Sequence, residues 1–407
     1  MGYSSETRCF EKLKILSAPS EGMSVKKLVA ANLLFVSLLL TPLRAQADTF
    51  ANAVRFFDFA EQTYPSLLRP GGPETQEIQG YYVRYYSGSG IYLGLLGDNV
   101  YALGGYLGSD LTYAGKLTDF ILVDPEDITN RFFSNARTTC SYFAESLFAR
   151  AEDIQRNLDI EASVEITLVG DKCRIEANSI PNHSFNDETA SFVDPVSAVN
   201  ASYEVPLYPQ FSAKTTPLSL EYDDAIFLNG VKLDLLAAGC FGVGDGRIGC
   251  FDIETPWRLD PMSAMNDFGV DVHNAHVQPG GQYHYHGNPN ALFDQSGDVS
   301  SPVIGFAADG FPIFGSFIDD QGVIREVKSS YKLREGARPS TTDSPGGTYD
   351  GTYRDDWEYS EGLGDLDECN GMMRDGSYGY YVVDQYPWVL GCYRGTPDPS
   401  FLKRNGR

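Results

Sequence analysis

Four of the five histidines in this 407-residue sequence crowd into one short stretch. They are His273, His276, His284 and His286, in the run HNAHVQPGGQYHYH at residues 273–286. Random scattering of five histidines would place about 0.17 of them in a given 14-residue stretch, so the cluster needs a chemical or structural reason. Neutral imidazole is a common protein ligand for Zn, Cu, Ni and Fe. A transition-metal site is therefore the first hypothesis.

The spacing of these histidines fits a strand that is preceded by a tight turn. In an extended strand His284 and His286 lie on one face, about 6.5 to 7 Å apart along the chain, with Tyr283 and Tyr285 on the other face. The turn-forming residues Pro-Gly-Gly at 279–281 can fold His276 back beside this pair. Three imidazoles would then converge, with His273 or His183 as a fourth ligand and Asp271 as a nearby carboxylate that could equally cap a turn.

The functional alternatives belong to different classes. The first is a protein that sequesters or delivers Cu or Zn, and the second is a hydrolytic or oxidative metalloenzyme in which water or O2 takes an open metal position. The third is a metal-free module whose aromatic surface binds a polysaccharide or a protein. In a purely structural alternative, the histidines hold no metal and hydrogen-bond to the backbone and to tyrosines. The sequence has only six methionines and none beside the histidines, which argues against Cu(I) delivery.

Other motifs indicate turns and give no catalytic residue. Asp309 stands in an Asp-Gly pair, a strong turn signal before a buried strand, and this interpretation outweighs a role as ligand or general base. The glycine-rich loop at residues 242–246 has no following Lys-Ser or Lys-Thr and is not a phosphate-binding loop. Neither a Gly-x-Ser-x-Gly nor a His-Glu-x-x-His motif occurs. Whether the protein is an enzyme stays open at this point.

Residues 162–396 resemble the YHYH-domain family, named for the tetrad that stands here at residues 283–286. Further segments match in order, namely SIPNH at 179–183, NGV at 229–231, DGFPIFG at 309–315 and LGCYRG at 390–395. The resemblance implies one domain that contains all five histidines, His183 included. Members of the family are mostly exported and have no established activity, so the resemblance implies a compartment and no reaction.

The same region contains an internal repeat. The series NGV at 229–231 and GQYHYH at 281–286 is echoed about 80 to 95 residues later by DGF at 309–311 and GSYGYY at 376–381. In this correspondence His284 is replaced by Gly379 and His286 by Tyr381. Glycine has no ligand atom and neutral tyrosine is a poor ligand, so we expect the second copy to be structural and the protein to hold one metal site.

The first 47 residues are predicted to be a signal region. Met23 is the favoured start, Lys26 and Lys27 precede an apolar run at residues 28–40, and Ala-Gln-Ala at 45–47 supplies a cleavage pattern. The apolar run is too short to cross a bilayer, so no membrane insertion is expected after cleavage. The protein is therefore predicted to be secreted or periplasmic. Its net charge of −24, or −27 without the signal region, disfavours nucleic acid as a partner.

Six cysteines remain after the signal region is removed. In an oxidising compartment they indicate up to three disulfides rather than a thiolate metal site. Local spacing favours one pair across a glycine-rich loop and one pair near the end of the chain, which leaves the remaining two for each other. The expected pairs are Cys240 with Cys250, Cys369 with Cys392, and Cys140 with Cys173.

The predicted fold is β-dominated, either all-β or α+β. Residues 49–122 are expected to form a small module of one amphipathic helix and a β-meander, which resembles an aromatic-rich accessory module of secreted proteobacterial proteins. Residues 123–160 are expected to be a connector with a helix, based on apolar positions at Phe143, Leu147, Ile154 and Leu158. Residues 162–396 are expected to form the internally duplicated β-rich domain.

Overall fold

The computed structural model describes residues 125–403 except residue 245, and short segments between residues 43 and 123. The chain divides into two compact units, Met1–Asp124 and Pro125–Arg407. Among the described residues no helix is long and apolar enough to cross a membrane. The predicted signal region lies outside the described residues except for β1 (Leu43–Ala45), which pairs in parallel with β7 (Ile121–Val123). Signal cleavage therefore stays a prediction.

The first unit contains the expected meander. Its antiparallel five-stranded sheet has the order β2-β3-β4-β5-β6. The strands are β2 (Gln76–Ile78), β3 (Tyr81–Tyr86), β4 (Ile91–Leu96), β5 (Asn99–Leu103) and β6 (Thr112–Lys116). The rings of Tyr85 and Tyr92 form a cross-strand pair with centroids 5.0 Å apart. Phe56 and Phe57 lie in helical turns and are fully buried, as the amphipathic pattern predicts.

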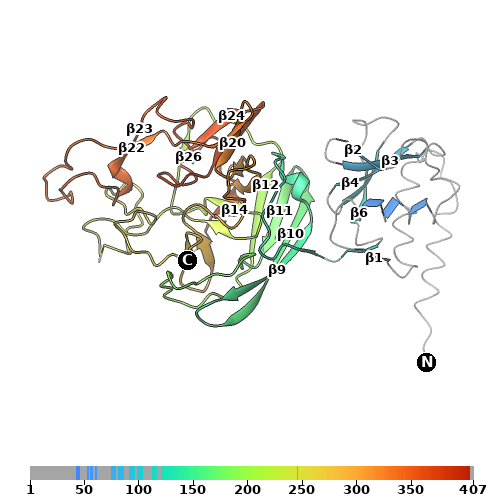
Figure 1. Ribbon diagram of the computed structural model, residues 1–407, viewed down its shortest axis with the longest axis horizontal. Coiled ribbons are helices and arrows are strands. Elements are labelled where there is room, and N and C mark those ends of the chain that lie inside the picture. The colour runs from blue at the N-terminus through green and yellow to red at the C-terminus, as the bar shows by residue number, and fades with distance from the viewer. Residues whose placement is uncertain are drawn as a thin grey trace. The chain divides into compact units, whose positions relative to one another are not determined.

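The second unit begins with a five-stranded sheet in the order β12-β11-β10-β9-β8, whose longer strands lie side by side in Figure 1. Its strands are β8 (Glu126–Asp127), β9 (Ser146–Asp153), β10 (Leu158–Val169), β11 (Lys172–Ala177) and β12 (Ala201–Pro206). The helix expected within residues 123–160 is wrong, because β9 and β10 form a hairpin there. Along β9 buried and less buried residues alternate, with Leu147, Ala149 and Ala151 inward. Small alanines obscured this period of two in the sequence.

An eight-stranded sheet forms the rest of the core, in the order β16-β17-β15-β14-β18-β19-β25-β24. Its strands are β14 (Ala225–Phe227), β15 (Lys232–Leu233), β16 (Ala275–Val277), β17 (Tyr283–Tyr285), β18 (Val303–Ala307), β19 (Pro312–Phe314), β24 (Gly371–Arg374) and β25 (Ser377–Tyr381). Each half consists of an outer hairpin at the edge of the sheet and an inner hairpin beside it, and the two hairpins of a half share one parallel strand pair, β15 with β17 or β19 with β25. The two halves meet through the antiparallel pair β14 and β18. The order reads the same from both edges, which confirms the internal repeat.

The two halves also repeat their hydrogen bonds. Asp271 accepts from the backbone N–H groups of residues 273 and 275, and from the hydroxyl of Tyr283. Asp367 accepts from the N–H groups of residues 369 and 371, and from the hydroxyl of Tyr378. Because each aspartate closes the turn before the outer hairpin, the duplication extends to the side chains that fix the hairpin's position.

The turns of the inner hairpins carry a second repeated contact. Asn229 donates to the hydroxyl of Tyr285, and in the other half the hydroxyl of Tyr380 donates to Asp309 over 2.6 Å. Gly310, at φ 89°, forms the corner of the β18–β19 hairpin. Asp309 precedes this corner, and its carboxylate is buried among hydrogen-bond partners of the protein itself.

One continuous core joins the two sheets. It includes residues of the five-stranded sheet, such as Val164 and Ile166, and of the eight-stranded sheet, such as Phe227 and Tyr285. Gly230, at φ 79°, lies so close to the first sheet that a Cβ atom there would come within 2.7 Å of Val164. The corner of the β14–β15 hairpin therefore tolerates only glycine, and this close approach locks the two sheets together.

Three disulfides tie loops to this frame. They join Cys140 to Cys173, Cys240 to Cys250, and Cys369 to Cys392, the pairs favoured by spacing in the sequence. The cysteines in the described part of the chain are all used in this way. No thiolate is left there for a metal.

We expect Asp309→Ala to lower the free energy of unfolding by about 2–4 kcal/mol, because it leaves the Tyr380 hydroxyl and the buried Gly395 N–H without an acceptor. Urea unfolding at pH 7 would measure the change. Asp298→Ala, at an exposed position, is the control and should alter stability by less than about 0.5 kcal/mol. Equal stability of the two variants would refute the structural role of Asp309.

Candidate metal centre

Three histidines converge on one face of the outer hairpin of the first half. β16 and β17 pair antiparallel, with His276 directly opposite His284. The turn between them uses Gly280 and Gly281 at φ 96° and 88°, as the Pro-Gly-Gly sequence predicts. His286 follows β17 two residues after His284 and so returns to the same face. The local strand pairing alone thus brings the three rings together.

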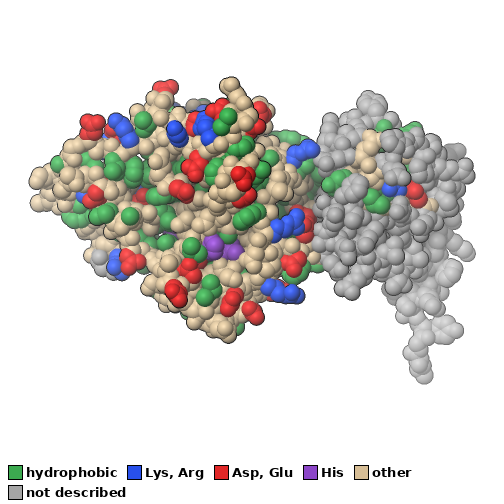
Figure 2. Space-filling view, viewed as in Figure 1, with side chains coloured by type: hydrophobic (Ala, Val, Ile, Leu, Met, Phe, Trp, Pro, Cys, Tyr) green, Lys and Arg blue, Asp and Glu red, His purple; other side chains and the backbone are tan. Residues whose placement is uncertain are grey.

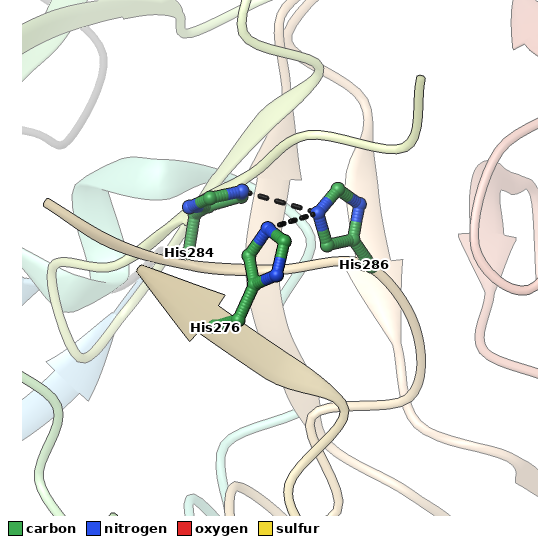
Figure 3. A group of neighbouring side chains, drawn as sticks. All are labelled: His276, His284 and His286. Carbon is green, nitrogen blue, oxygen red and sulfur yellow. Dashed lines mark hydrogen bonds between the residues drawn. The ribbon is translucent and has the colours of Figure 1, made fainter. Parts of the chain in front are cut away.

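The three rings point their Nε2 atoms toward a common centre (Figure 3). The Nε2 atom of His286 lies 3.1 Å from that of His284 and 3.0 Å from that of His276. One ligand atom from each ring lies within 4.8 Å of the others, and no other such group of histidine, cysteine and carboxylate side chains occurs among the described residues. Two imidazole nitrogens bound tetrahedrally to one ion at about 2.05 Å lie about 3.3 Å apart. A shift of a few tenths of an ångström would therefore accommodate an ion.

The tautomers of two rings are fixed by backbone carbonyls. Nδ1 of His276 donates to the carbonyl of Phe268 over 2.7 Å, and Nδ1 of His284 donates to the carbonyl of Gln282 over 3.3 Å. A neutral ring whose Nδ1 carries the proton presents a lone pair at Nε2. Metal-binding histidines in proteins typically have such a carbonyl behind them.

His286 cannot satisfy both neighbours with a proton. Its Nε2 atom faces the lone pairs of His276 and His284, and an imidazole nitrogen carries either one proton or one lone pair. A proton on this atom would form a hydrogen bond to only one of the two other rings. A cation at the centre would instead accept a lone pair from the Nε2 atom of each of the three rings. Nδ1 of His286 is buried and has no hydrogen-bond partner. Side chains alone leave this site incompletely satisfied.

Burial keeps the three rings neutral. It lowers the pKa of His276 below its ordinary value, and lowers those of His284 and His286 well below it. The charges of neighbouring histidines add to this effect for His284 and His286, while the charge of Asp234 opposes it for His286 and is outweighed. Because the neutral form is the ligand form, the nitrogens are ready to bind a metal at pH 7 and somewhat below.

A buried network of charges lies beside the triad. Lys232 is opposite His284 in the parallel pair of β15 and β17, and only 2% of its surface is exposed. Its Nζ atom lies 2.6 Å from a carboxylate oxygen of Asp223 and 3.6 Å from one of Asp234. Lys403 lies 2.6 Å from Asp234. Burying these charges is tolerated because each lysine has a carboxylate partner.

Asp224 adds a carboxyl group that titrates near neutrality. Burial, followed by the charge of Asp234, raises the pKa of Asp224 to about 7. The Tyr393 hydroxyl and the Leu235 N–H both donate to it. This network was not predicted from the sequence. Its signal is the alternation of Lys232 and Asp234 within the otherwise apolar segment at residues 231–236, which places both charges on one strand face.

His183 and His273, expected as candidates for the fourth ligand, lie apart from the triad. Their rings contact each other with centroids 4.0 Å apart. The Nε2 atom of His183 accepts from the hydroxyl of Tyr285 over 2.6 Å, since its Nδ1 atom donates to the Ser184 carbonyl. Tyr285 points away from His284 and His286 because β17 alternates its faces. Asp271 is engaged by backbone N–H groups and Tyr283, so it caps a turn and does not join the histidines.

The second half has no equivalent of the triad. Its register places Met372 opposite Gly379, as His276 is opposite His284. Tyr381 takes the place of His286 and stacks on Phe314 at 5.1 Å, within an apolar cluster. A Cβ atom on Gly379 would lie 2.5 Å from the ring of Phe314, so a histidine does not fit there. These contacts agree with the expectation that the second copy is structural.

Comparison with known proteins gives one match. The model of the family described as YHYH protein matches residues 202–395, which cover the triad and both halves of the eight-stranded sheet. No curated protein and no solved structure matches the chain. The accessory-module resemblance proposed for residues 49–122 lies outside the matched region.

His183 makes the fold sensitive to acid. Burial and the charge of His273 lower its pKa to about 3, so as the pH falls below about 6.5 the unfolded chain takes up this proton before the folded chain does. The stability that neutral His183 contributes is therefore present above pH 6.5 and lost toward pH 3. We expect the difference in unfolding free energy between wild type and His183→Gln to shrink by about 2 kcal/mol between pH 7 and pH 5.

Urea unfolding at both pH values measures this difference, and all other titrating groups are common to the two proteins. A difference between wild type and His183→Gln that is constant with pH would contradict the assignment of a buried neutral ring at residue 183.

Proposed function

We propose, on the premise that this chain belongs to the YHYH family through residues 202–395, that it is an exported protein that binds one transition-metal ion. The ligands are the Nε2 atoms of His276, His284 and His286. The observation that carries the proposal is the pair of short Nε2 contacts at His286, which one proton cannot satisfy and one cation can.

The ligand set favours Zn or Cu. Imidazole suits both metals, whereas magnesium and calcium prefer oxygen ligands. The described cysteines are held in disulfides, so no thiolate in the described part of the chain adds a soft ligand that would favour Cu(I). Zn(II) and Cu(II) are therefore the ions to test first.

Export to an oxidising compartment is part of the proposal. Three disulfides are typical of secreted or periplasmic proteins and rare in the cytosol. The apolar segment before residue 48 supplies the signal for export in the same proposal.

We expect the purified mature protein to hold about one equivalent of Zn or Cu. Elemental analysis of protein that has never met a nickel column measures the content. Removal of the ion with a chelator should lower the melting temperature, because an ion bound only by the folded state stabilises it. Protein that is metal-free as isolated, with a melting temperature unchanged by added Zn or Cu, would refute the proposal.

The variants His284→Ala and His286→Ala should each reduce bound metal to less than about 0.2 equivalents, because two imidazoles hold an ion far less tightly than three. His273→Ala is the matched control, since it removes a histidine of the same cluster that lies outside the triad. Tyr381→Phe tests the corresponding position of the second half. Both controls should retain about one equivalent.

A metalloenzyme is the second candidate, and one observation favours it. The triad supplies three ligands without a fourth from the described residues, and His276 is only half-buried. Catalytic zinc sites use three protein ligands and leave one position for water, whereas structural sites use four. Figure 2 shows histidine side chains at the surface of the described part of the chain.

The open position can be tested by spectroscopy. We expect protein reconstituted with Co(II) to change its visible absorption spectrum when azide is added, because azide replaces the water on the fourth position. Co(II) protein of His273→Ala should respond in the same way. A spectrum insensitive to azide would indicate a closed site and favour storage or a structural role over catalysis.

A further inference from the structure

A separate cavity of about 550 Å³ opens beside the metal centre, and its lining includes neither His276, His284 nor His286. Its wall contains the His183–His273 pair, which is anchored through Tyr285 to the opposite face of β17. The volume lies within the range of about 300–1,000 Å³ usual for small-molecule sites. Because the triad does not line this cavity, a role in metal binding does not account for the cavity.

The lining is polar but nearly neutral. It has no lysine or arginine, its one carboxylate is Asp384, and much of the rest is amide side chains of asparagine and glutamine. His183 and His273 complete the polar part. A site without a cation on an acidic chain disfavours phosphate, sulfate or carboxylate ligands. A ligand with many neutral hydrogen-bonding groups fits it better.

The lining presents hydrogen-bond acceptors. Asn288 is 3% exposed, and its Oδ1 atom has no partner, although its Nδ2 atom donates to Asp384 over 2.8 Å. Asn290 donates to the Val272 carbonyl, which turns its Oδ1 atom toward Nδ1 of His273 at 2.7 Å. Because Nδ1 of His273 donates to this oxygen, Nε2 is the ring atom left to accept a hydrogen bond. Unmet acceptors in a cavity are suited to a ligand that brings hydroxyl donors.

Apolar side chains border the same cavity. Phe132, Ile154 and Val272 line it and remain 48%, 42% and 52% exposed. When a ligand covers large apolar groups that are exposed to water beside a polar pocket, the free energy of the complex is lowered. A sugar ring has both kinds of surface, with hydroxyl groups at its edge and C–H groups on its faces.

We propose that this cavity binds a neutral sugar residue of a glycan. Hydroxyl groups donate to Asn288, His273 and Asp384, and a ring face packs on Phe132. The proposal is independent of the metal centre, because it rests on residues that do not hold the ion. Binding should therefore persist after metal is removed.

The test begins with a glycan array that displays neutral and anionic glycans, probed with the metal-loaded and the metal-depleted protein. We expect neutral glycans to be bound by both forms, with dissociation constants between about 10 μM and 1 mM by calorimetry. Phe132→Ala should weaken binding of the strongest neutral glycan about tenfold. Because Phe132 is exposed, this variant should fold normally, and its metal content checks that the triad is intact.

Tyr208→Ala is the matched control, since Tyr208 is an exposed aromatic residue that does not line the cavity. It should bind glycan as the wild type does. Three outcomes would overturn the proposal: no glycan bound, only anionic glycans bound, or equal affinity of Phe132→Ala and wild type. Displacement of the glycan by spermidine at equal concentration would also overturn it, because that result would identify an amine site at Asp384.

Discussion

The alternation of side chains along β17 is the constraint on which the rest of the site depends. Because the strand turns successive residues to opposite faces, Tyr283 and Tyr285 enter the core while His284 and His286 meet His276 on the other side. The tyrosine hydroxyls then bond to Asp271 and His183, which fix the strand from behind. A shift by one residue would exchange the two sets and place imidazoles in the core. The register that stabilises the fold is thus also the register that assembles the triad.

Comparison of the two halves of the sheet distinguishes the contacts needed to pair the hairpins from the residues needed to bind a metal. Both halves keep the aspartate that caps the turn and bonds to a tyrosine, and both keep the inner tyrosine bonded to the corner of the inner hairpin. These contacts are needed to pair the hairpins. The opposite face is free to differ, and it carries three imidazoles in one half and Met372, Gly379 and Tyr381 in the other. Chemistry and folding therefore occupy different faces of the same strands.

Much of this could be predicted from the sequence because it depends on short spacing. The two-residue interval of His284 and His286, the Pro-Gly-Gly turn, the repeat and the disulfide pairs are all local or repeated patterns. The helix expected at residues 123–160 was wrong because Ala149 and Ala151 mark the inner face of β9 only weakly. The separation of His183 from the triad, and the pairing of Lys232 with Asp223 and of Lys403 with Asp234, depend on tertiary packing. No periodicity in the sequence encodes such contacts.

The two halves also show that the triad does not serve stability. In the second half, stacking of Tyr381 on Phe314 fills the equivalent space with apolar contacts. In the first half, by contrast, His286 has one buried nitrogen without a partner and another that faces two lone pairs. Each unsatisfied buried polar atom costs about 1–3 kcal/mol, so the same backbone would be more stable with the apolar solution. A cation at the centre removes the part of this cost that arises at the Nε2 atoms, since it accepts all three lone pairs at once.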